Sequence, residues 1–347
     1  MKNILYIIGH KTLMDYEIPI LIEKGYGVYV ARIKDYNSLS LHTIHTTLDK
    51  YDSSLSLPAS TLEKLNNTDF YSNSSSSSID MELINESFNI IFLTLLDSPI
   101  RLFKTHFKGT IYYRLFGREA AYSYRGLVQA SPNIRYLFPY EEVRSFELPP
   151  PTVITKDNSY VVPLGVPDSL SKYHMNTWNP IINKVCFVCC KINNCSYYTN
   201  VYNTFMATIG ARFDYQMLGK NNNVINPNLL NGLDDTAYYS VISQCKVMYY
   251  NEVNARHLHY HPLEAIIIGV PIIFHRESLL NSFIGTSPGA CSSMEEIYTK
   301  LRQILDGDTA LITSILNEQS KAQEQLKICN NLNSFDKLLA DAEAVYT

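Results

Sequence analysis

The N-terminal part of the chain alternates short apolar runs with one longer amphipathic stretch. Residues 3–8 and 28–32 are apolar and rich in β-branched side chains, which predicts two strands. The stretch between them predicts a helix that ends near Lys24, because Gly25 can adopt the left-handed conformation that stops helices. A strand, a helix and a second strand in this order are typical of a βαβ unit, so the pattern predicts a parallel sheet.

Residues 37–87 lose this periodicity. They carry Ser53, Ser54, Asn66, Asn67 and the run Ser74–Ser78, a composition that cannot supply a packed core. We therefore expect an irregular, partly disordered excursion. Regular patterning then resumes, with strands predicted over 89–94, 110–115, 134–138 and 160–162 and a helix over 101–108.

The second half of the chain repeats the alternation of strands and helices. Two proline-rich segments, Glu147–Pro151 and Pro163–Pro167, are candidate domain boundaries, and we divide the chain between residues 160 and 161. Beyond this point the pattern predicts strands over 184–190, 215–218, 247–250 and 272–274, and helices over 199–210, 235–244 and 262–268. Two doubly wound α/β units in tandem fit this order best, followed by a helical tail over 294–306 and 310–345.

Composition agrees with two globular domains. The chain has 347 residues, of which 46% are hydrophobic and 18% charged, and its net charge is −4. No block of Lys and Arg suggests a nucleic-acid partner. The apolar start is too short for a signal peptide, and no apolar stretch is long enough to span a bilayer. We therefore expect a cytoplasmic protein and leave peripheral membrane contact open.

Four of the seven cysteines lie close together in the sequence, at Cys186, Cys189, Cys190 and Cys195. A metal cluster is one interpretation of this spacing. A buried strand over 184–190 is the other, and we favour it because alternation would send Cys189 and Cys190 to opposite faces.

The segment Tyr260–Phe274 carries the clearest chemical signal. Pro262 suits the first turn of a helix, Glu264 in that turn complements the helix dipole, and Gly269 can end the helix before Pro271. A helix N-terminus at the mouth of a parallel sheet binds anions, and a carboxylate beside it accepts hydrogen bonds from ribose hydroxyls. The alternative is an ordinary helix–strand unit in which Glu264 only complements the dipole.

This segment resembles the C-terminal signature of GT-B glycosyltransferases, particularly the large retaining family (family 4-like) that builds bacterial polysaccharides. Val161–Pro167 resembles the interdomain segment of those enzymes, and Ala237–Val247 resembles the helix and strand before the donor site. The resemblance implies that Glu264 binds the donor ribose. It also implies two Rossmann-like domains, an acceptor domain over 1–160 and a nucleotide-sugar donor domain over 161–325, closed by a C-terminal helix over 326–347.

One position departs from the family pattern. Members often carry a second glutamate eight positions before the ribose glutamate, where this chain has Arg256, and the nearest upstream carboxylate is Glu252. Arg256 is a candidate contact for a donor phosphate, because a guanidinium matches phosphate oxygens, or else a solvated surface charge.

Three histidines alternate along the segment before the helix, at His257, His259 and His261, so an extended backbone would place them on one face. Such a face could hold zinc, but no fourth ligand is evident and GT-B enzymes generally need no protein-bound metal, so we expect no metal or other cofactor. His261 is the best donor contact of the three. Its pairing with Pro262 also resembles some sialic-acid and Kdo transferases, which keeps a CMP-sugar donor open.

Further candidates follow the predicted strands. Gly219 and Lys220 come directly after one strand, and Arg276 and Ser278 after another, where ligands of doubly wound sheets bind. We expect these four residues to contact the donor, with Lys220, Arg276 and Ser278 binding its phosphates. A plain turn is the alternative for Gly219 and Lys220.

The N-terminal half offers candidates for the acceptor side. His10 follows Gly9 at the end of the first strand, and the resemblance implies that it can act as the base that deprotonates the acceptor hydroxyl. Arg114, Arg118 and Glu119 are acceptor-side candidates. Asp15 and Glu17 are expected on a helix surface.

Together these features predict an enzyme that transfers a sugar from a nucleotide-sugar donor to the hydroxyl of a glycan, lipid-linked or protein acceptor, in glycan or polysaccharide synthesis, with domain closure excluding water. Two alternatives stay open: a nucleotide-sugar 2-epimerase of the same architecture, and a non-catalytic glycosyltransferase-like partner protein.

Overall fold

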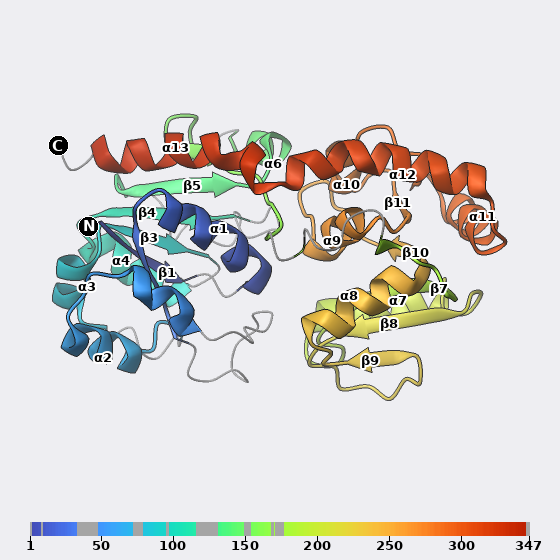
Figure 1. Ribbon diagram of the computed structural model, residues 1–347, viewed down its shortest axis with the longest axis horizontal. Coiled ribbons are helices and arrows are strands. Elements are labelled where there is room, and N and C mark those ends of the chain that lie inside the picture. Colours follow the sequence, from blue (N-terminus) through green and yellow to red (C-terminus); the bar gives the residue numbers. More distant parts are fainter. Residues whose placement is uncertain are drawn as a thin grey trace. The chain divides into compact units, whose positions relative to one another are not determined.

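The computed structural model describes residues 2–7, 10–32, 48–71, 79–94, 97–115, 131–148, 154–167, 170 and 177–344. Gly9, Arg118, Glu119 and the run Ser74–Ser78 lie outside the described residues. The chain divides into two units, Met1–Pro167 with Ile328–Thr347, and Asp168–Lys327. Each unit contains one six-stranded parallel sheet with helices packed on it, as the alternating pattern predicts (Figure 1).

The sheet of the first unit has the strand order β2-β1-β3-β4-β5-β6. Every pair of neighbours is parallel, so each connection crosses over the sheet, mostly through a helix. The strands are β1 (Asn3–Ile7), β2 (Gly27–Val30), β3 (Ile90–Leu93), β4 (Thr110–Arg114), β5 (Ile134–Phe138) and β6 (Ser159–Val161). The helices that cover them include α1 (Lys11–Glu23), α4 (Asp97–His106) and α6 (Glu141–Glu147).

The expected excursion contains more structure than its composition indicates. Within the described parts of 37–87 lie η1 (Leu48–Ser54), α2 (Ala59–Asn67) and α3 (Met81–Ser87). Leu65, Phe70 and Ile84 are buried, so the expectation that this segment supplies no packed core is wrong for these parts. The few apolar residues are spaced so that each short helix buries one of them, which a composition average conceals.

The C-terminal helix α13 (Ile328–Ala344) belongs to the first unit, where it lies along α1 and β5 (Figure 1). Tyr16 of α1 meets Phe335 edge-on at 6.4 Å between ring centroids. The Tyr112 hydroxyl donates to the carbonyl of Leu338 at 2.6 Å, and Arg135 pairs with Asp341. The chain thus leaves the first unit after its last strand and returns to it with its last helix.

A buried ion pair lies in the core of the first unit. Glu17 of α1 and Arg114 of β4 are both fully buried and form a salt bridge. The Tyr6 hydroxyl donates to Glu17 Oε2 at 2.6 Å, and Arg114 Nη1 donates to the carbonyl of Val162 at 2.6 Å. The expectation that Glu17 lies on a helix surface is therefore wrong, because the sheet covers the face of α1 that carries it.

The sheet of the second unit has the order β12-β11-β10-β7-β8-β9 and is also parallel throughout. Its strands are β7 (Ile182–Val188), β8 (Tyr215–Gly219), β9 (Leu229–Asn231), β10 (Cys245–Tyr250), β11 (Ile272–His275) and β12 (Ala290–Cys291). The helices are α7 (Ser196–Ala207), α8 (Asp235–Gln244), α9 (Tyr260–Ile268), α10 (Leu279–Ile284), α11 (Met294–Leu305) and α12 (Thr309–Gln323), followed by the short η5 (Glu324–Leu326). The predicted second doubly wound unit is confirmed.

The cysteines of the second unit contribute to its core. Cys186 and Cys189 are buried, Cys190 and Cys195 are partly exposed, and all four are free thiols. Strand β7 ends at Val188, two residues before the predicted end, so Cys189 and Cys190 open the loop that follows it.

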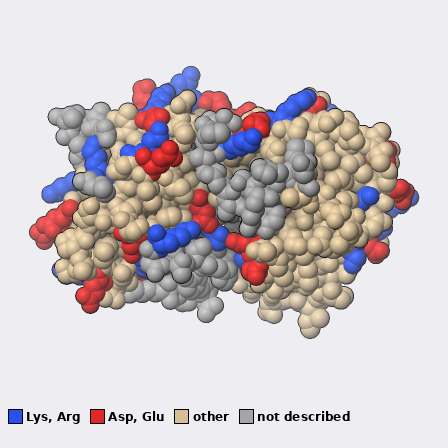
Figure 2. Space-filling model, in the orientation of Figure 1, with Lys and Arg blue, Asp and Glu red and all other residues tan. Residues whose placement is uncertain are grey.

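Charge is mixed over the visible surface. On the face drawn in Figure 2, basic and acidic side chains of the described residues are interspersed, without a basic stripe. Among the described residues, no helix combines the length and apolarity needed to cross a bilayer.

Replacing Glu17 tests the importance of the buried ion pair. Glu17→Ala leaves the Arg114 guanidinium buried without its carboxylate, so we expect a loss of about 3–5 kcal/mol in the free energy of unfolding, measured with urea. Tyr6→Phe removes only one hydrogen bond to Glu17 and should cost about 1 kcal/mol. The exposed Glu63→Ala is the control and should stay within about 0.5 kcal/mol of the wild type. Equal effects of Glu17→Ala and Glu63→Ala would refute the importance of the pair.

Candidate functional site

The order of the strands in the second unit reverses between β7 and β10. The chain runs outward from β7 through β8 to β9, then returns to the other side of β7 and continues through β10, β11 and β12. The loops that leave β7 and β10 at their carboxyl ends therefore diverge to opposite faces of the sheet and leave a crevice between them. Ligands of doubly wound sheets bind at this place.

The helices that flank the crevice differ from their neighbours in how they begin. Neither α7 nor α9 receives a capping hydrogen bond from the side chain of its N-cap residue, Cys195 or His259. These helices follow β7 and β10, the strands on either side of the reversal. By contrast, α8, α10, α11 and α12 are capped by the side chains of Asp234, Ser278, Ser293 and Asp308. Anions bind at helix N-termini, so the crevice between these two helix starts suits a phosphate.

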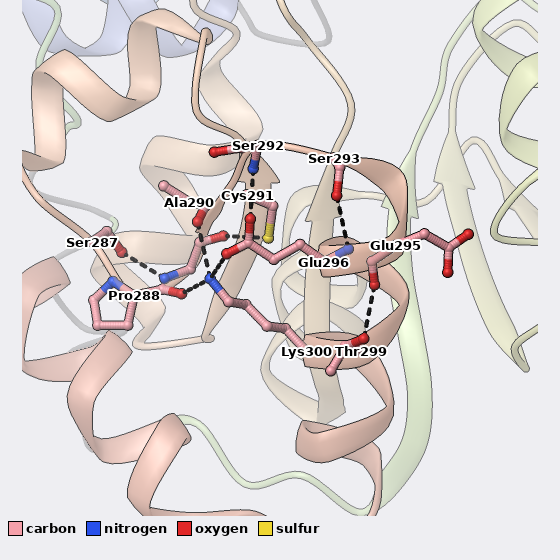
Figure 3. Close-up of polar contacts among 11 residues, drawn as sticks. Ser287, Pro288, Ala290, Cys291, Ser292, Ser293, Glu295, Glu296, Thr299 and Lys300 are labelled. Atoms are coloured by element: carbon pink, nitrogen blue, oxygen red, sulfur yellow. Dashed lines mark hydrogen bonds and ion pairs between the residues drawn. The ribbon is translucent and has the colours of Figure 1, made fainter.

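At the N-terminus of helix α11, side chains of the protein itself occupy the place where an anion could bind. Ser293 Oγ accepts from the backbone N–H of Glu296, while the Glu296 carboxylate accepts from the backbone N–H of Ser292 and pairs with Lys300 (Figure 3). Lys300 Nζ also donates to the carbonyls of Pro288 and Ala290. This end of the sheet already holds its own carboxylate, so it is not the anion site.

The loop after β7 places a lysine in the crevice. Lys191 is only 7% exposed and has a positive φ of 55°, a conformation uncommon outside glycine. Its N–H donates to the carbonyl of Lys220, and its own carbonyl accepts from the N–H groups of Asn194 and Cys195. Burial lowers the pKa of Lys191, because the ammonium is partly desolvated there, and an anion beside it would stabilise the charged form. Sequence reasoning missed Lys191, although its place just after a buried strand was a usable signal.

Three charged residues of the site meet around Cys190. Burial raises the pKa of the Cys190 thiol, its hydrogen bond to the backbone of Lys220 and the charges of Lys220 and Lys191 lower it, and the charge of Glu264 raises it. Electrostatic effects of this kind need proximity. The backbones of Lys191 and Lys220 are also joined by a hydrogen bond, so these two lysines and Glu264, two of the three predicted from the sequence, lie around the loop that carries Cys190.

Glu264 is held by two phenols. It is 6% exposed, and its carboxylate oxygens accept from the hydroxyls of Tyr238 at 3.2 Å and Tyr239 at 3.4 Å, both on α8. Helix α9 begins at Tyr260 rather than Pro262, so Glu264 lies in the second turn and the expectation of a first-turn carboxylate is wrong. The reason is that proline tolerates any position in the first turn, where no N–H is required. The predicted left-handed stop is confirmed, with Gly269 at a φ of 86°.

His261 and Arg256 lie on the α9 side of the crevice. The His261 ring meets the ring of Tyr250 edge-on at 5.2 Å, and burial, with a smaller contribution from His257, lowers its pKa to about 3. His261 is thus neutral near pH 7. The backbone N–H of Arg256 donates to Asn254 Oδ1 in a turn, and its side chain is partly exposed.

The remaining donor candidates have structural surroundings of their own. A Cβ at Gly219 would collide with the carbonyl of Cys189 and the side chain of Asn222, so this glycine permits close packing of two loops. Ser278 is buried, and its hydroxyl caps α10 by accepting from the N–H of Leu280. Arg276 is exposed, and its charge helps to lower the pKa of Glu296, after the larger effects of Lys300 and Ser292, so it lies by the β12 edge.

In the first unit the strand order reverses between β1 and β3, and His10 follows β1. The imidazole Nδ1 accepts from the N–H of Leu13 at 3.4 Å and so caps α1. Burial lowers the pKa of His10 to about 4. A cap through Nδ1 puts the proton of the neutral ring on Nε2, so a basic Nε2 requires the other tautomer. Arg114, the acceptor candidate among the described residues besides His10, would have to leave its salt bridge with Glu17 to reach a ligand.

The lowered pKa of His10 predicts a pH dependence of stability. The unfolded chain binds a proton at His10 near pH 6.5 and the folded chain only near pH 4, so the free energy of unfolding is retained above this window and falls as the pH is lowered through it. His10→Asn keeps a capping side chain without this titration and should flatten that slope in urea unfolding experiments. The exposed His106→Asn should leave the slope unchanged. Identical slopes for His10→Asn and the wild type would contradict the assignment.

No protein-family model and no curated protein matches this sequence. Solved structures do match its fold. Anabaena HepE, solved in complex with UDP and glucose, is 10% identical over 98% of this chain and 100% of its own, with a TM-score of 0.59. A sucrose-phosphate synthase from Thermosynechococcus elongatus is 11% identical over 99% and 100%, with a TM-score of 0.65.

A third similar structure is the phage T4 β-glucosyltransferase in complex with UDP and Mn²⁺, 12% identical over 97% of this chain and 99% of its own, with a TM-score of 0.57. At such low identities the similarity concerns the fold. Together with the two parallel sheets, it confirms the expectation from the sequence that this chain has the GT-B fold.

Proposed function

We propose that this protein is a glycosyltransferase that moves a sugar from a nucleotide-sugar donor to an acceptor hydroxyl. The observation that carries the proposal is the convergence of Lys191, Lys220 and Glu264 at the strand-order reversal of the second unit, between two helices without side-chain caps. The fold agrees, since structures similar to this chain were solved with UDP and glucose.

The donor would bind with its diphosphate at the N-terminus of α7 and its ribose at Glu264. Lys191 and Lys220 supply positive charge to the phosphates, and backbone N–H groups of the helix supply donors. The phenols of Tyr238 and Tyr239 hold the Glu264 carboxylate in place, and a ribose hydroxyl would donate to the same carboxylate. Arg256 and His261 fit additional contacts to the donor, while Arg276 and Ser278 lie farther along the sheet and are weaker candidates.

In the reaction, the bond between the anomeric carbon and the donor phosphate breaks, and the acceptor oxygen forms the new bond after losing its proton. The negative charge that develops on the leaving diphosphate is stabilised by the two lysines and the helix N–H groups, which are already in place. We assign the acceptor to the first unit, with His10 as the candidate base. The signature over 160–275 supports a polysaccharide-type enzyme, for which a cytoplasmic location is expected.

Glu264→Ala should weaken nucleotide binding. The loss of hydrogen bonds to a charged group costs about 1.5–3 kcal/mol, or roughly ten- to a hundredfold in the Kd measured by calorimetry. The nucleotide is first chosen by thermal shift among UDP, GDP, CMP and dTDP. Glu295→Ala, an exposed acid on α11, is the matched control and should bind as the wild type does.

Nucleotide binding unchanged by Glu264→Ala would sink the ribose assignment. Turnover is then followed with the matching sugar nucleotides, with and without acceptor sugars and with and without Mn²⁺, because the similar T4 enzyme was solved with that ion. Donor conversion without any acceptor would point to a 2-epimerase. No binding and no turnover across the panel would favour the non-catalytic partner protein.

Lys191→Met should act on phosphate recognition alone. Methionine keeps the apolar stem and removes the charge, so the affinity for the nucleoside diphosphate should fall roughly tenfold or more while the affinity for the bare nucleoside stays unchanged. Calorimetry with UDP and uridine, or the pair selected above, measures the difference. Lys321→Met, which changes an exposed lysine of α12, is the control. A parallel loss for both ligands would assign Lys191 to folding rather than to phosphate binding.

A further inference from the structure

The loop between β10 and α9 gathers three side chains that can bind a metal ion. One ligand atom from each of Glu252, His257 and His259 lies within 4.8 Å of the other two. The sequence offered only the alternating histidines and no further ligand, whereas the folded loop adds Glu252. We propose that Glu252, His257 and His259 form a binding site for a divalent transition-metal ion, with Zn²⁺ as the reference ion.

The two imidazoles are placed as ligands of one ion. His257 Nε2 and His259 Nε2 are 3.4 Å apart. Two nitrogens that bind a tetrahedral zinc at about 2.0–2.1 Å lie about 3.3 Å from each other, so the observed separation already fits. The ring planes are nearly perpendicular, at 84°, so the two rings are not stacked and the contact between them is made through their edges.

Tyr250 orients His259. Its hydroxyl lies 3.2 Å from His259 Nδ1 and accepts from the backbone N–H of the same residue at 3.2 Å. A proton on Nδ1 that is donated to this oxygen puts the lone pair of the neutral ring on Nε2, which is the usual arrangement behind metal-bound histidines. Tyr250 ends strand β10, so the ring is fixed by the sheet itself.

Glu252 is fixed from both sides of the crevice. It is 8% exposed, its Oε2 accepts from the Tyr197 hydroxyl at 2.8 Å, and its Oε1 accepts from the N–H of Asn254 at 3.0 Å. Tyr197 lies in the first turn of α7, on the other side of the strand-order reversal. The buried carboxylate already lies within 4.8 Å of both imidazole ligand atoms, so a movement of at most about 1.5 Å brings the three ligand atoms to the separation of one tetrahedral shell.

The ligand set decides the class of ion. Two imidazoles and one carboxylate suit zinc and its transition-metal neighbours rather than Mg²⁺ or Ca²⁺, which prefer oxygen ligands throughout. Three protein ligands leave at least one coordination position for water or an anion. The site does not depend on the proposed sugar transfer, because binding of the ion alone tests it.

The experiment uses the purified full chain without a histidine tag, freed of metal with a chelator and titrated with Zn²⁺ and Mg²⁺ by calorimetry. We expect one Zn²⁺ per chain and much weaker binding of Mg²⁺. Glu252→Gln, His257→Gln and His259→Gln should each weaken Zn²⁺ binding at least tenfold. Tyr197→Phe, which removes the phenol that positions Glu252, should weaken it roughly 10-fold or more. The exposed His106→Gln is the control and should bind as the wild type does.

A spectroscopic measurement on the wild type keeps the test independent of the folding of these variants. X-ray absorption of the Zn²⁺ complex should show two imidazoles and no sulfur in the coordination shell. The absorption measurement would overturn the proposal if it showed fewer than two imidazoles or any sulfur in the coordination shell. The titration would overturn it if the Kd for Zn²⁺ were above about 1 mM, or if the wild type and all three ligand variants bound Zn²⁺ equally well. Unchanged nucleotide binding in the metal-free protein would leave the donor proposal standing whatever the outcome here.

Discussion

The parallel pairing of β7 with β10 is the constraint on which the functional part of this protein depends. Val185 lies opposite Val247 and Cys186 opposite Met248, although some sixty residues separate the two strands in the chain. Because the strands run in the same direction, the loops that follow them leave from the same edge. Because their crossover helices lie on opposite faces, those loops diverge and the crevice opens. The pairing thus fixes the edge from which the loop with Lys191 and the segment leading to Glu264 leave the sheet.

The helices on either side of this crevice begin differently from the helices elsewhere in the second unit. Ser293, Glu296 and Lys300 close the N-terminus of α11 with their own side chains, whereas α7 and α9 have no side-chain cap. Burying Lys191 and Glu264 beside these helices costs desolvation free energy, which a bound ligand of complementary chemistry would offset. Helix starts without a side-chain cap thus mark the part of the sheet proposed to bind the donor, and capped helix starts mark the part that does not.

The first unit also has a parallel sheet, but charged side chains lie in its core. Its core holds the Glu17–Arg114 ion pair, which joins α1 to β4 and, through the carbonyl of Val162, to the segment that follows the last strand. Such a pair fixes the relative placement of these elements more than it stabilises them. His10 lies at the strand-order reversal of this unit and caps α1 as a neutral imidazole. The ring that would act as a base is therefore the same ring that caps the helix.

The sequence by itself determined the two doubly wound units, most of the strands and the α9 segment with its stop at Gly269, because periodicity and turn chemistry act over neighbouring residues. It did not reveal that Glu17 is buried or that Lys191 joins Lys220 and Glu264. Those relations depend on which strands pair and which loops share an edge. Only the tertiary structure decides them, since contacts between residues far apart in the chain leave no local pattern.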